Sequence, residues 1–394
     1  FQAEDGIRDY KVTGVQTCAL PIWDPLLIPW LTRTVVADAA AIRRLVDLRD
    51  AVATDPASDP ALRAAFAAQA WYTGRAWGGQ APTPEARPMY EGTVDPLPPV
   101  EIPFLGEPDD PTSVVVRAQY EEHPYPRLVG VHLRERVGLS AYVQAACRLD
   151  RAFPPDARVL VAGGGTGRHP IGLASAVGPV TCIDLSRASL AIAAALARRH
   201  GIPVRFLHGD LLTLPPELGP FDFVDCVGVL HHLRDPARGL AGLVRQLAPG
   251  GLVRLGLYSE RGRAEVVAAR AVVADLTPDD DGLHTARARL LALPPDHPAA
   301  PIAGSVDLWT QPGLRDLVFH PCEHRYTPTQ VRALVEGAGL RVAALQHASS
   351  EPARLYAARW PEDGAQADLD RWDELERGHP RIFTGMIHVW CERG

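Results

Sequence analysis

The segment 159–170, with the sequence VLVAGGGTGRHP, restricts the fold of this chain more than any other part of it. Four apolar residues run directly into a turn that has glycine at positions 163, 164, 165 and 167. Such an apolar run is typical of a strand buried on both faces of a parallel sheet, and a glycine turn lets the chain enter a helix at once. The segment therefore predicts the nucleotide-binding corner of a doubly wound α/β sheet, where ligands bind beyond the carboxyl ends of the strands.

The spacing of the glycines narrows the kind of nucleotide. The dinucleotide fingerprint G-x-G-x-x-G needs a third glycine, at which helix and strand pack closely. Counted from Gly163 that position is Arg168, and counted from Gly165 it is Pro170. The chain instead has a G-x-G-x-G arrangement that ends at Gly167, which disfavours an NAD-dependent oxidoreductase. These glycines let the backbone approach a ligand that has no pyrophosphate, and a tight turn without a ligand is the alternative.

Strand and helix patterns alternate from residue 158 onward, which predicts a parallel sheet with right-handed crossovers. We therefore expect an α/β fold built on a Rossmann-like, doubly wound, seven-stranded sheet. The expected helices are 168–176, 189–201, 236–247 and 327–336. The expected strands are 158–162, 179–184, 204–210, 221–229, 252–259, 340–345 and 380–392.

Two carboxylates end strands of this predicted sheet. Asp184 ends the second strand, where a carboxylate can accept hydrogen bonds from both hydroxyls of a ribose. Asp210 ends the third strand, where it can accept a hydrogen bond from an adenine amine while Leu211 packs on the ring. The alternative roles are a helix cap for Asp184 and an ordinary loop acid for Asp210.

This ordered set of residues resembles the class I S-adenosylmethionine (SAM) methyltransferases over residues 158–260. Nearly all of the chain after residue 24 resembles a narrower group, the methyltransferases often found downstream of tetratricopeptide repeats. The resemblance implies SAM as the cofactor and transfer of its methyl group to an acceptor by in-line displacement. The implied cofactor-binding residues are Gly163, Gly165, Gly167, Asp184, Leu185, Asp210, Leu211 and Tyr120. The narrower resemblance is carried by 119–128 (QYEEHPYPRL), 229–233 (VLHHL), 257–259 with Arg263, 319–327 (FHPCEHRYT) and 383–390 (FTGMIHVW).

Three positions depart from these families. Many class I enzymes carry an acid at the end of the first strand that meets the methionyl ammonium, and Val161 stands in its place here. In the narrower group the proline motif has asparagine before it and tryptophan after it, where this chain has His123 and Leu128. We therefore expect carbonyl groups of the loop, or a residue of the N-terminal segment, to bind the ammonium.

Methyl transfer from a sulfonium needs alignment and exclusion of water, and it needs a base only if the acceptor must lose a proton. His231, directly after the fourth strand, is the first candidate for that base, and a histidine bonded to backbone at a helix start is the alternative. A candidate acceptor-binding role falls to four residues: Tyr125, Arg127, Tyr258 and His320.

Each of these residues also has a simpler interpretation. The faces of Tyr120, Tyr125 and Tyr258 can attract a sulfonium by cation–π interaction, while packing in the core is an equal alternative. Arg127 can bind a carboxylate or phosphate of the acceptor, while pairing with a nearby acid is the alternative.

The chain divides into three predicted parts. Residues 1–22 resemble the translation of a sequencing-library adapter, and they hold Lys11, the one lysine in a chain without asparagine. Residues 23–115 are expected to form a helical segment and a proline-rich linker, and 116–394 the methyltransferase domain. Within that domain 261–325 is expected to form a helical insertion after the fifth strand that caps the acceptor. The narrower resemblance adds the expectation that a repeat array preceded the chain.

Composition narrows the partners. The net charge of −7 disfavours a surface that coats nucleic acid. No apolar run approaches the roughly 18 residues of a membrane span. The six cysteines are scattered without a C-x-x-C or Cys/His zinc spacing, so we expect no metal site and a cytoplasmic protein with reduced thiols. The acceptor is then an unidentified small molecule or protein side chain.

Two other functions stay open from the sequence. A SAM-binding interaction module or pseudo-enzyme, linked to the repeat array, is the first, because Val161 replaces an acid and no base is evident. An NAD-dependent oxidoreductase is the second, and the missing third glycine counts against it.

Overall fold

The computed structural model describes residues 101–126, 131 and 133–394, all of them within the compact unit Gly92–Gly394. Residues 1–22, the expected helical segment and most of its linker (23–100), and Arg127 and Leu128 lie outside the described residues. The expectations for those parts stay predictions.

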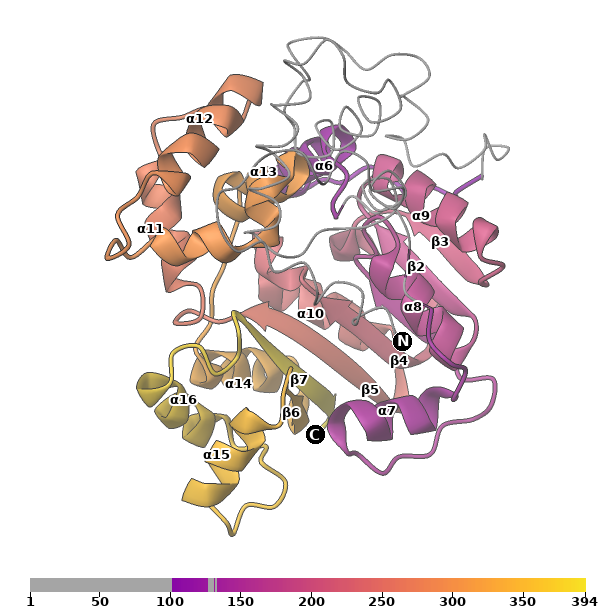
Figure 1. The fold of residues 1–394 in the computed structure, drawn as a ribbon. Helices are drawn as coiled ribbons and strands as arrows, with labels where there is room; N and C mark the ends of the chain where they lie inside the picture. Colours follow the sequence, from indigo (N-terminus) through magenta and orange to yellow (C-terminus); the bar gives the residue numbers. More distant parts are fainter. Residues whose placement is uncertain (1–100, 127–130, 132) are drawn as a thin grey trace, which may run out of the picture. The chain divides into compact units, whose positions relative to one another are not determined.

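A seven-stranded sheet with the order β3-β2-β1-β4-β5-β7-β6 forms the centre of the fold (Figure 1). Strands β1 to β5 pair in parallel, and β7 runs antiparallel to both of its neighbours. The predicted doubly wound, seven-stranded sheet is thereby confirmed. The strands are β1 (Val159–Ala162), β2 (Val180–Asp184), β3 (Val204–His208), β4 (Phe221–Val227), β5 (Leu247–Tyr258), β6 (Leu340–Gln346) and β7 (Met386–Arg393).

Helices cover both faces of the sheet (Figure 1). The α-helices are α6 (Pro111–Glu122), α7 (Leu139–Cys147), α8 (Arg168–Val177), α9 (Arg187–Arg199), α10 (Pro236–Arg245), α11 (Ala264–Val272), α12 (Asp280–Leu291), α13 (Gln311–Phe319), α14 (Pro328–Gly337), α15 (Glu351–Arg359) and α16 (Leu369–Gly378). The 3₁₀ turns are η2 (Leu211–Thr213), η3 (Pro216–Leu218), η4 (Leu230–His232), η5 (Ala300–Gly304) and η6 (Val306–Trp309).

Strand β1 shows why its sequence is apolar without interruption. Val159 and Val161 pack with residues of α7, α8 and α9 on one face. Leu160 and Ala162 belong to the apolar cluster on the other face, which also includes residues of α10, α14 and α16. Because successive side chains point to opposite faces and both faces are covered, every position in the strand is buried.

The expected helical insertion follows β5 and consists of α11, α12, η5, η6 and α13 (orange in Figure 1). Two helices after β6, α15 and α16, are absent from the sequence prediction. Tyr356 of α15 and Trp372 of α16 are fully buried, with ring centroids 4.5 Å apart. These two aromatic residues pack the helices against each other. None of the helices in the described part of the chain is both long and apolar enough to cross a membrane.

Several element ends differ from the prediction by a few residues. Strand β3 ends at His208 instead of residue 210, because Asp210 caps η2 by accepting a hydrogen bond from the Leu212 N–H at 2.9 Å. Strand β5 begins at Leu247, before the proline-glycine turn that was expected to precede it. Strand β7 begins only at Met386.

Candidate active site

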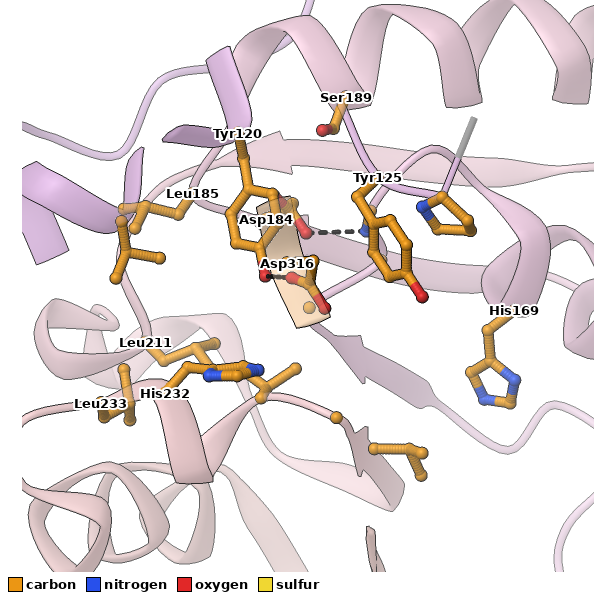
Figure 2. Close-up of a pocket in the computed structure, with 18 of the residues that line it drawn as sticks. Tyr120, Tyr125, His169, Asp184, Leu185, Ser189, Leu211, His232, Leu233 and Asp316 are labelled. Carbon is orange, nitrogen blue, oxygen red and sulfur yellow. Dashed lines mark hydrogen bonds between the residues drawn. The ribbon is translucent and has the colours of Figure 1, made fainter. Parts of the chain in front are cut away.

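A cavity of about 340 Å³ lies where β1, β2, β4 and β5 end, and α6, the loop after it and α13 complete its wall. This volume is within the range of roughly 300–1,000 Å³ typical of small-molecule sites. Figure 2 shows side chains from these separate elements converging on it. The predicted residues that line the cavity are Gly163, Gly165, Asp184, Leu185, Asp210, Leu211, Tyr120, Tyr125 and Tyr258.

The glycine loop approaches its surroundings too closely for side chains. A Cβ on Gly163 would lie 2.1 Å from Val229 Cγ2, and one on Gly165 would lie 2.7 Å from the Tyr125 carbonyl oxygen. Gly167 does not line the cavity: its φ is +102° and a Cβ there would lie 2.9 Å from the Cα of Ala193 in α9. The structure thus places Gly167, predicted to bind the cofactor, in the close packing between the start of α8 and α9 instead of in the cavity wall.

Asp184 lies at the end of β2 with its carboxylate in the cavity wall. One oxygen accepts from the Gly165 N–H at 2.7 Å and the other from the Ser186 N–H at 2.9 Å. Burial raises the pKa of Asp184, and these backbone donors oppose the rise. The helix cap is Ser186 rather than Asp184, since the Ser186 hydroxyl accepts from the first turn of α9. Each oxygen of Asp184 keeps a lone pair for a ligand hydroxyl.

Asp210 carries an unused acceptor. Its Oδ1 accepts the hydrogen bond that caps η2, but its Oδ2 is buried and has no hydrogen-bond partner among the described residues. The residue is 3% exposed and lines the cavity beside Leu211. A buried acceptor without a partner costs free energy of about 1–3 kcal/mol, so this oxygen favours a ligand that donates a hydrogen bond to it.

Two tyrosine–aspartate pairs join the N-terminal side of the cavity to the insertion. The Tyr120 hydroxyl donates to Asp316 at 2.7 Å, and the Tyr125 hydroxyl donates to Asp307 at 3.0 Å. Burial raises the pKa of each aspartate to about 6, although the tyrosine hydrogen bond opposes the rise. Asp316 reaches the cavity from α13, so the insertion contributes a carboxylate to the same space as the glycine loop (Figure 2).

His231 does not line the cavity, contrary to the expectation for a base. It lies behind Tyr258, with ring centroids 3.8 Å apart, and its Nδ1 accepts from the Tyr258 N–H at 3.3 Å. Its neighbour His232 lines the cavity instead. The 3₁₀ turn η4 rotates the chain by about a third of a turn per residue, so adjacent side chains point in different directions.

His320 is also behind the cavity wall rather than in it. Its ring stacks on His232 with centroids 3.7 Å apart, and only 1% of the residue is exposed. Both histidines bond the backbone of Cys322: His232 Nδ1 lies 2.8 Å from the carbonyl oxygen, and the N–H donates to His320 Nδ1 at 3.2 Å. Burial lowers the pKa of His232 to about 4 and that of His320 to about 2.

His232, Asp316 and His320 have side-chain ligand atoms within 4.8 Å of one another, a combination that metals use. The hydrogen bond from the Cys322 N–H opposes such a site. This hydrogen bond occupies the Nδ1 lone pair of His320, so the proton of the neutral ring is on Nε2. Neither nitrogen then has a free lone pair for a metal ion.

Sequence reasoning missed His169, which lines the cavity at the start of α8. Its Nε2 lies 2.8 Å from the carboxylate of Asp225, which is fully buried in β4 and also lies 3.5 Å from the Arg254 guanidinium. The neighbouring arginine and His169 hold the pKa of Asp225 below its usual value against the effect of burial. An acid in the middle of the apolar strand FDFVDCV was the sequence feature that could have found this pair. The predicted acceptor residue Arg127 lies outside the described residues.

Comparison with known proteins agrees with this geometry. Residues 159–251 match the profile of a family described as "Methyltransferase domain". Within this segment the chain is similar to methyltransferase domains. The sheet has the Rossmann-like fold of PKMT2 from Rickettsia typhi, whose structure in complex with AdoHcy aligns with a TM-score of 0.50, 14% identity, and coverage of 68% of this chain and 55% of that one. At this identity the likeness concerns the fold.

Two relatives illustrate how far sequence similarity extends. An uncharacterized protein of Synechococcus sp. is 32% identical over 277 residues, which are 65% of this chain and 65% of that protein. A ubiquinone biosynthesis O-methyltransferase of Aromatoleum aromaticum is 35% identical over 97 residues, 24% of this chain and 42% of that protein. The chain thus spans less than two thirds of either relative.

Proposed function

We propose that this chain transfers the methyl group of SAM to a small molecule or protein side chain bound against the helical insertion. The unpartnered Oδ2 of Asp210 is the observation that carries the proposal. The adenine amine of SAM is a donor that this oxygen lacks, and Leu211 beside it offers an apolar surface to the ring.

The other cavity residues fit the remaining parts of SAM. The free lone pairs of Asp184 can accept from both ribose hydroxyls. The glycines at 163 and 165 leave room for backbone to approach the methionyl part, and Leu185 lines the wall beside the ribose position. Arg168 and His169 lie in the wall next to the loop and can bind the methionyl carboxylate.

The insertion supports a reaction shielded from water. Asp316 of α13 lines the cavity, and it accepts a hydrogen bond from Tyr120 of α6. This bond holds α6 and the insertion together over the cavity. The tyrosines 120, 125 and 258 line the same cavity and can attract a sulfonium by about 0.5–2 kcal/mol each. Exclusion of water and alignment are the main demands of transfer from an activated donor.

The relatives support the donor half of this proposal more than the acceptor half. The O-methyltransferase of Aromatoleum aromaticum and a demethylmenaquinone methyltransferase of Thermus thermophilus match over 97 and 68 residues. These matches span only 24% and 17% of this chain, so they do not identify an acceptor. We also propose a cytoplasmic location, which the five free cysteines among the described residues support. The resemblance of the motifs supports an upstream tetratricopeptide array.

A non-catalytic SAM-binding module is the second candidate function. It is favoured by Val161, which is buried in the core at the position where the resemblance to class I enzymes implies an acid. No contact among the described residues favours an oxidoreductase. SAM has no pyrophosphate, so it does not need the last glycine of the G-x-G-x-x-G fingerprint, which this chain lacks.

Isothermal titration with SAM and S-adenosylhomocysteine tests the donor site. We expect one molecule to bind per chain, and Asp210→Asn to weaken binding about tenfold or more, because one charged hydrogen bond contributes about 1.5–3 kcal/mol. Asp222→Asn is the matched control, since Asp222 bonds the Arg158 N–H at the start of β4, at the opposite edge of the sheet. Equal affinities for the two variants would contradict the adenine assignment, and transfer of labelled methyl separates an enzyme from a binding module.

A further inference from the structure

We propose that His232 takes the proton of the acceptor and that the acceptor is a neutral hydroxyl group, such as an alcohol, enol or phenol. The inference rests on the proposed methyl transfer and deepens it. Its basis is the geometry of His232, which lines the cavity, and of Cys322 and His320, which lie behind it.

The backbone of Cys322 fixes opposite tautomers for the two stacked histidines. A carbonyl oxygen can only accept, so the Nδ1 of His232, 2.8 Å away, must carry a proton. A backbone N–H can only donate, so the Nδ1 of His320, 3.2 Å away, must carry a lone pair. In the neutral rings, His232 therefore has its lone pair at Nε2 and His320 has its proton at Nε2.

This arrangement prepares His232 as a proton acceptor. The His232 ring lines the cavity. Its position is fixed by the hydrogen bond to the Cys322 carbonyl and by stacking on the His320 ring. The second imidazole nitrogen of a general base is commonly held in this way, which fixes the tautomer and orients the free lone pair. His231 cannot serve, because its Nδ1 lone pair is used by the Tyr258 N–H.

The charged groups around His232 keep it neutral before the reaction and favour its charge afterwards. Burial lowers its pKa, Arg263 and Arg270 add to this effect, and the Cys322 carbonyl and Glu323 oppose it. Asp316 lies within 4.8 Å and can stabilise an imidazolium once it forms. The titratable groups that face the ring are His231, Tyr258, His320, Asp316, Glu323, Arg263 and Arg270.

The step balances without a further reagent. The acceptor oxygen forms a bond to the methyl carbon, and the carbon–sulfur bond breaks with its electron pair remaining on sulfur. The hydroxyl proton moves to Nε2 of His232. The products are a methyl ether, neutral S-adenosylhomocysteine and an imidazolium, which then loses its proton to solvent.

The surroundings select this acceptor class over others. A hydroxyl oxygen that has gained a methyl group is strongly acidic, so even a weakly basic, buried histidine removes its proton. A carboxylate or thiolate acceptor attacks without losing a proton and meets the negative charge of Asp316 in the cavity wall. An amine acceptor is charged in water, and Asp316 favours that non-nucleophilic form.

Nuclear magnetic resonance of ¹⁵N-histidine-labelled protein tests the tautomers without an acceptor. Two-bond proton–nitrogen correlations assign the protonated nitrogen of each ring, and spectra of His232→Gln and His320→Gln identify the two residues. We expect Nδ1–H for His232 and Nε2–H for His320 at neutral pH. Nε2–H on His232, or Nδ1–H on His320, overturns the proposal.

Methyl transfer to a defined mixture tests the acceptor class. Catechol, benzyl alcohol, benzylamine and benzoate are incubated together with methyl-labelled SAM. We expect label on a hydroxyl probe, a loss of about 10²–10⁴-fold in rate in His232→Gln with unchanged affinity for S-adenosylhomocysteine, and no loss in the surface control His200→Gln. We also expect EDTA to leave the rate unchanged.

Three results contradict the acceptor assignment. These are label on benzylamine or benzoate, no label on either hydroxyl probe, and a rate abolished by EDTA and restored by a divalent ion. If the wild-type chain binds neither SAM nor S-adenosylhomocysteine, the proposed function itself fails, which is a distinct outcome.

Discussion

The replacement Gly167→Ala tests how the glycine loop is built. Gly167 has a φ of +102°, and a Cβ there would lie 2.9 Å from both Ala193 and the Ile171 Cδ1 atom. The left-handed backbone costs an L-residue roughly 1–2 kcal/mol. Forcing a methyl group into a packed contact costs roughly 1–3 kcal/mol more. The expected loss in free energy of unfolding is therefore about 2–5 kcal/mol.

Gly201→Ala is the matched control, because Gly201 has a φ of +64° but a Cβ there would meet no atom within 4 Å. Its expected loss is only the backbone contribution, roughly 1–2 kcal/mol. Urea denaturation followed by circular dichroism measures both variants. Equal losses would refute the close approach of α8 and α9. Retained stability with abolished S-adenosylhomocysteine binding would restore the direct ligand contact that the sequence predicted for Gly167.

Further predictions concern buried charge. Burial lowers the pKa of His232 to about 4 and of His320 to about 2, so their neutral forms stabilise the fold fully above about pH 6.5 and the contribution is lost as pH falls below it. At pH 5 each histidine therefore lowers the free energy of unfolding by about 2 kcal/mol. Asp316 partly offsets this loss, because its pKa is raised to about 6 in the folded state and its protonation favours the fold as pH falls. Urea unfolding at pH 7 and pH 5 should show a smaller pH effect in His320→Gln than in the wild type, and an unchanged effect contradicts the burial argument. Glu323→Gln should cost about 3–5 kcal/mol in thermal unfolding, because Arg263 and Arg270 lose a buried anionic partner; a loss below about 1 kcal/mol contradicts this.

Local sequence patterns predicted the sheet because its strands are buried on both faces. A run such as Val159–Ala162 has few conformations that hide every side chain, so its structure follows from its composition. The glycine spacing likewise constrains a turn whose dimensions are local. The acids at 184 and 210 follow from strand ends, which the pattern places to within a few residues.

Contacts between distant segments were beyond local patterns. Tyr120 and Asp316 are 196 residues apart in the chain, and nothing in either segment indicates their hydrogen bond. His231 and His232 are consecutive residues of a 3₁₀ turn, so their side chains point in different directions. The sequence pattern does not show which of the two points into the cavity. Helix α16 is rich in charged residues, and its buried Leu369, Trp372 and Leu375 become recognisable as a packing face only in the structure.

A crystal structure of the chain with S-adenosylhomocysteine tests the central claim most directly. We predict the adenine amine about 2.7–3.2 Å from Asp210 Oδ2, the ribose hydroxyls on Asp184, and the sulfur facing the part of the cavity that His232 and Asp316 line. An adenine that leaves Asp210 Oδ2 without a donor, or a ligand bound outside this cavity, would contradict that claim.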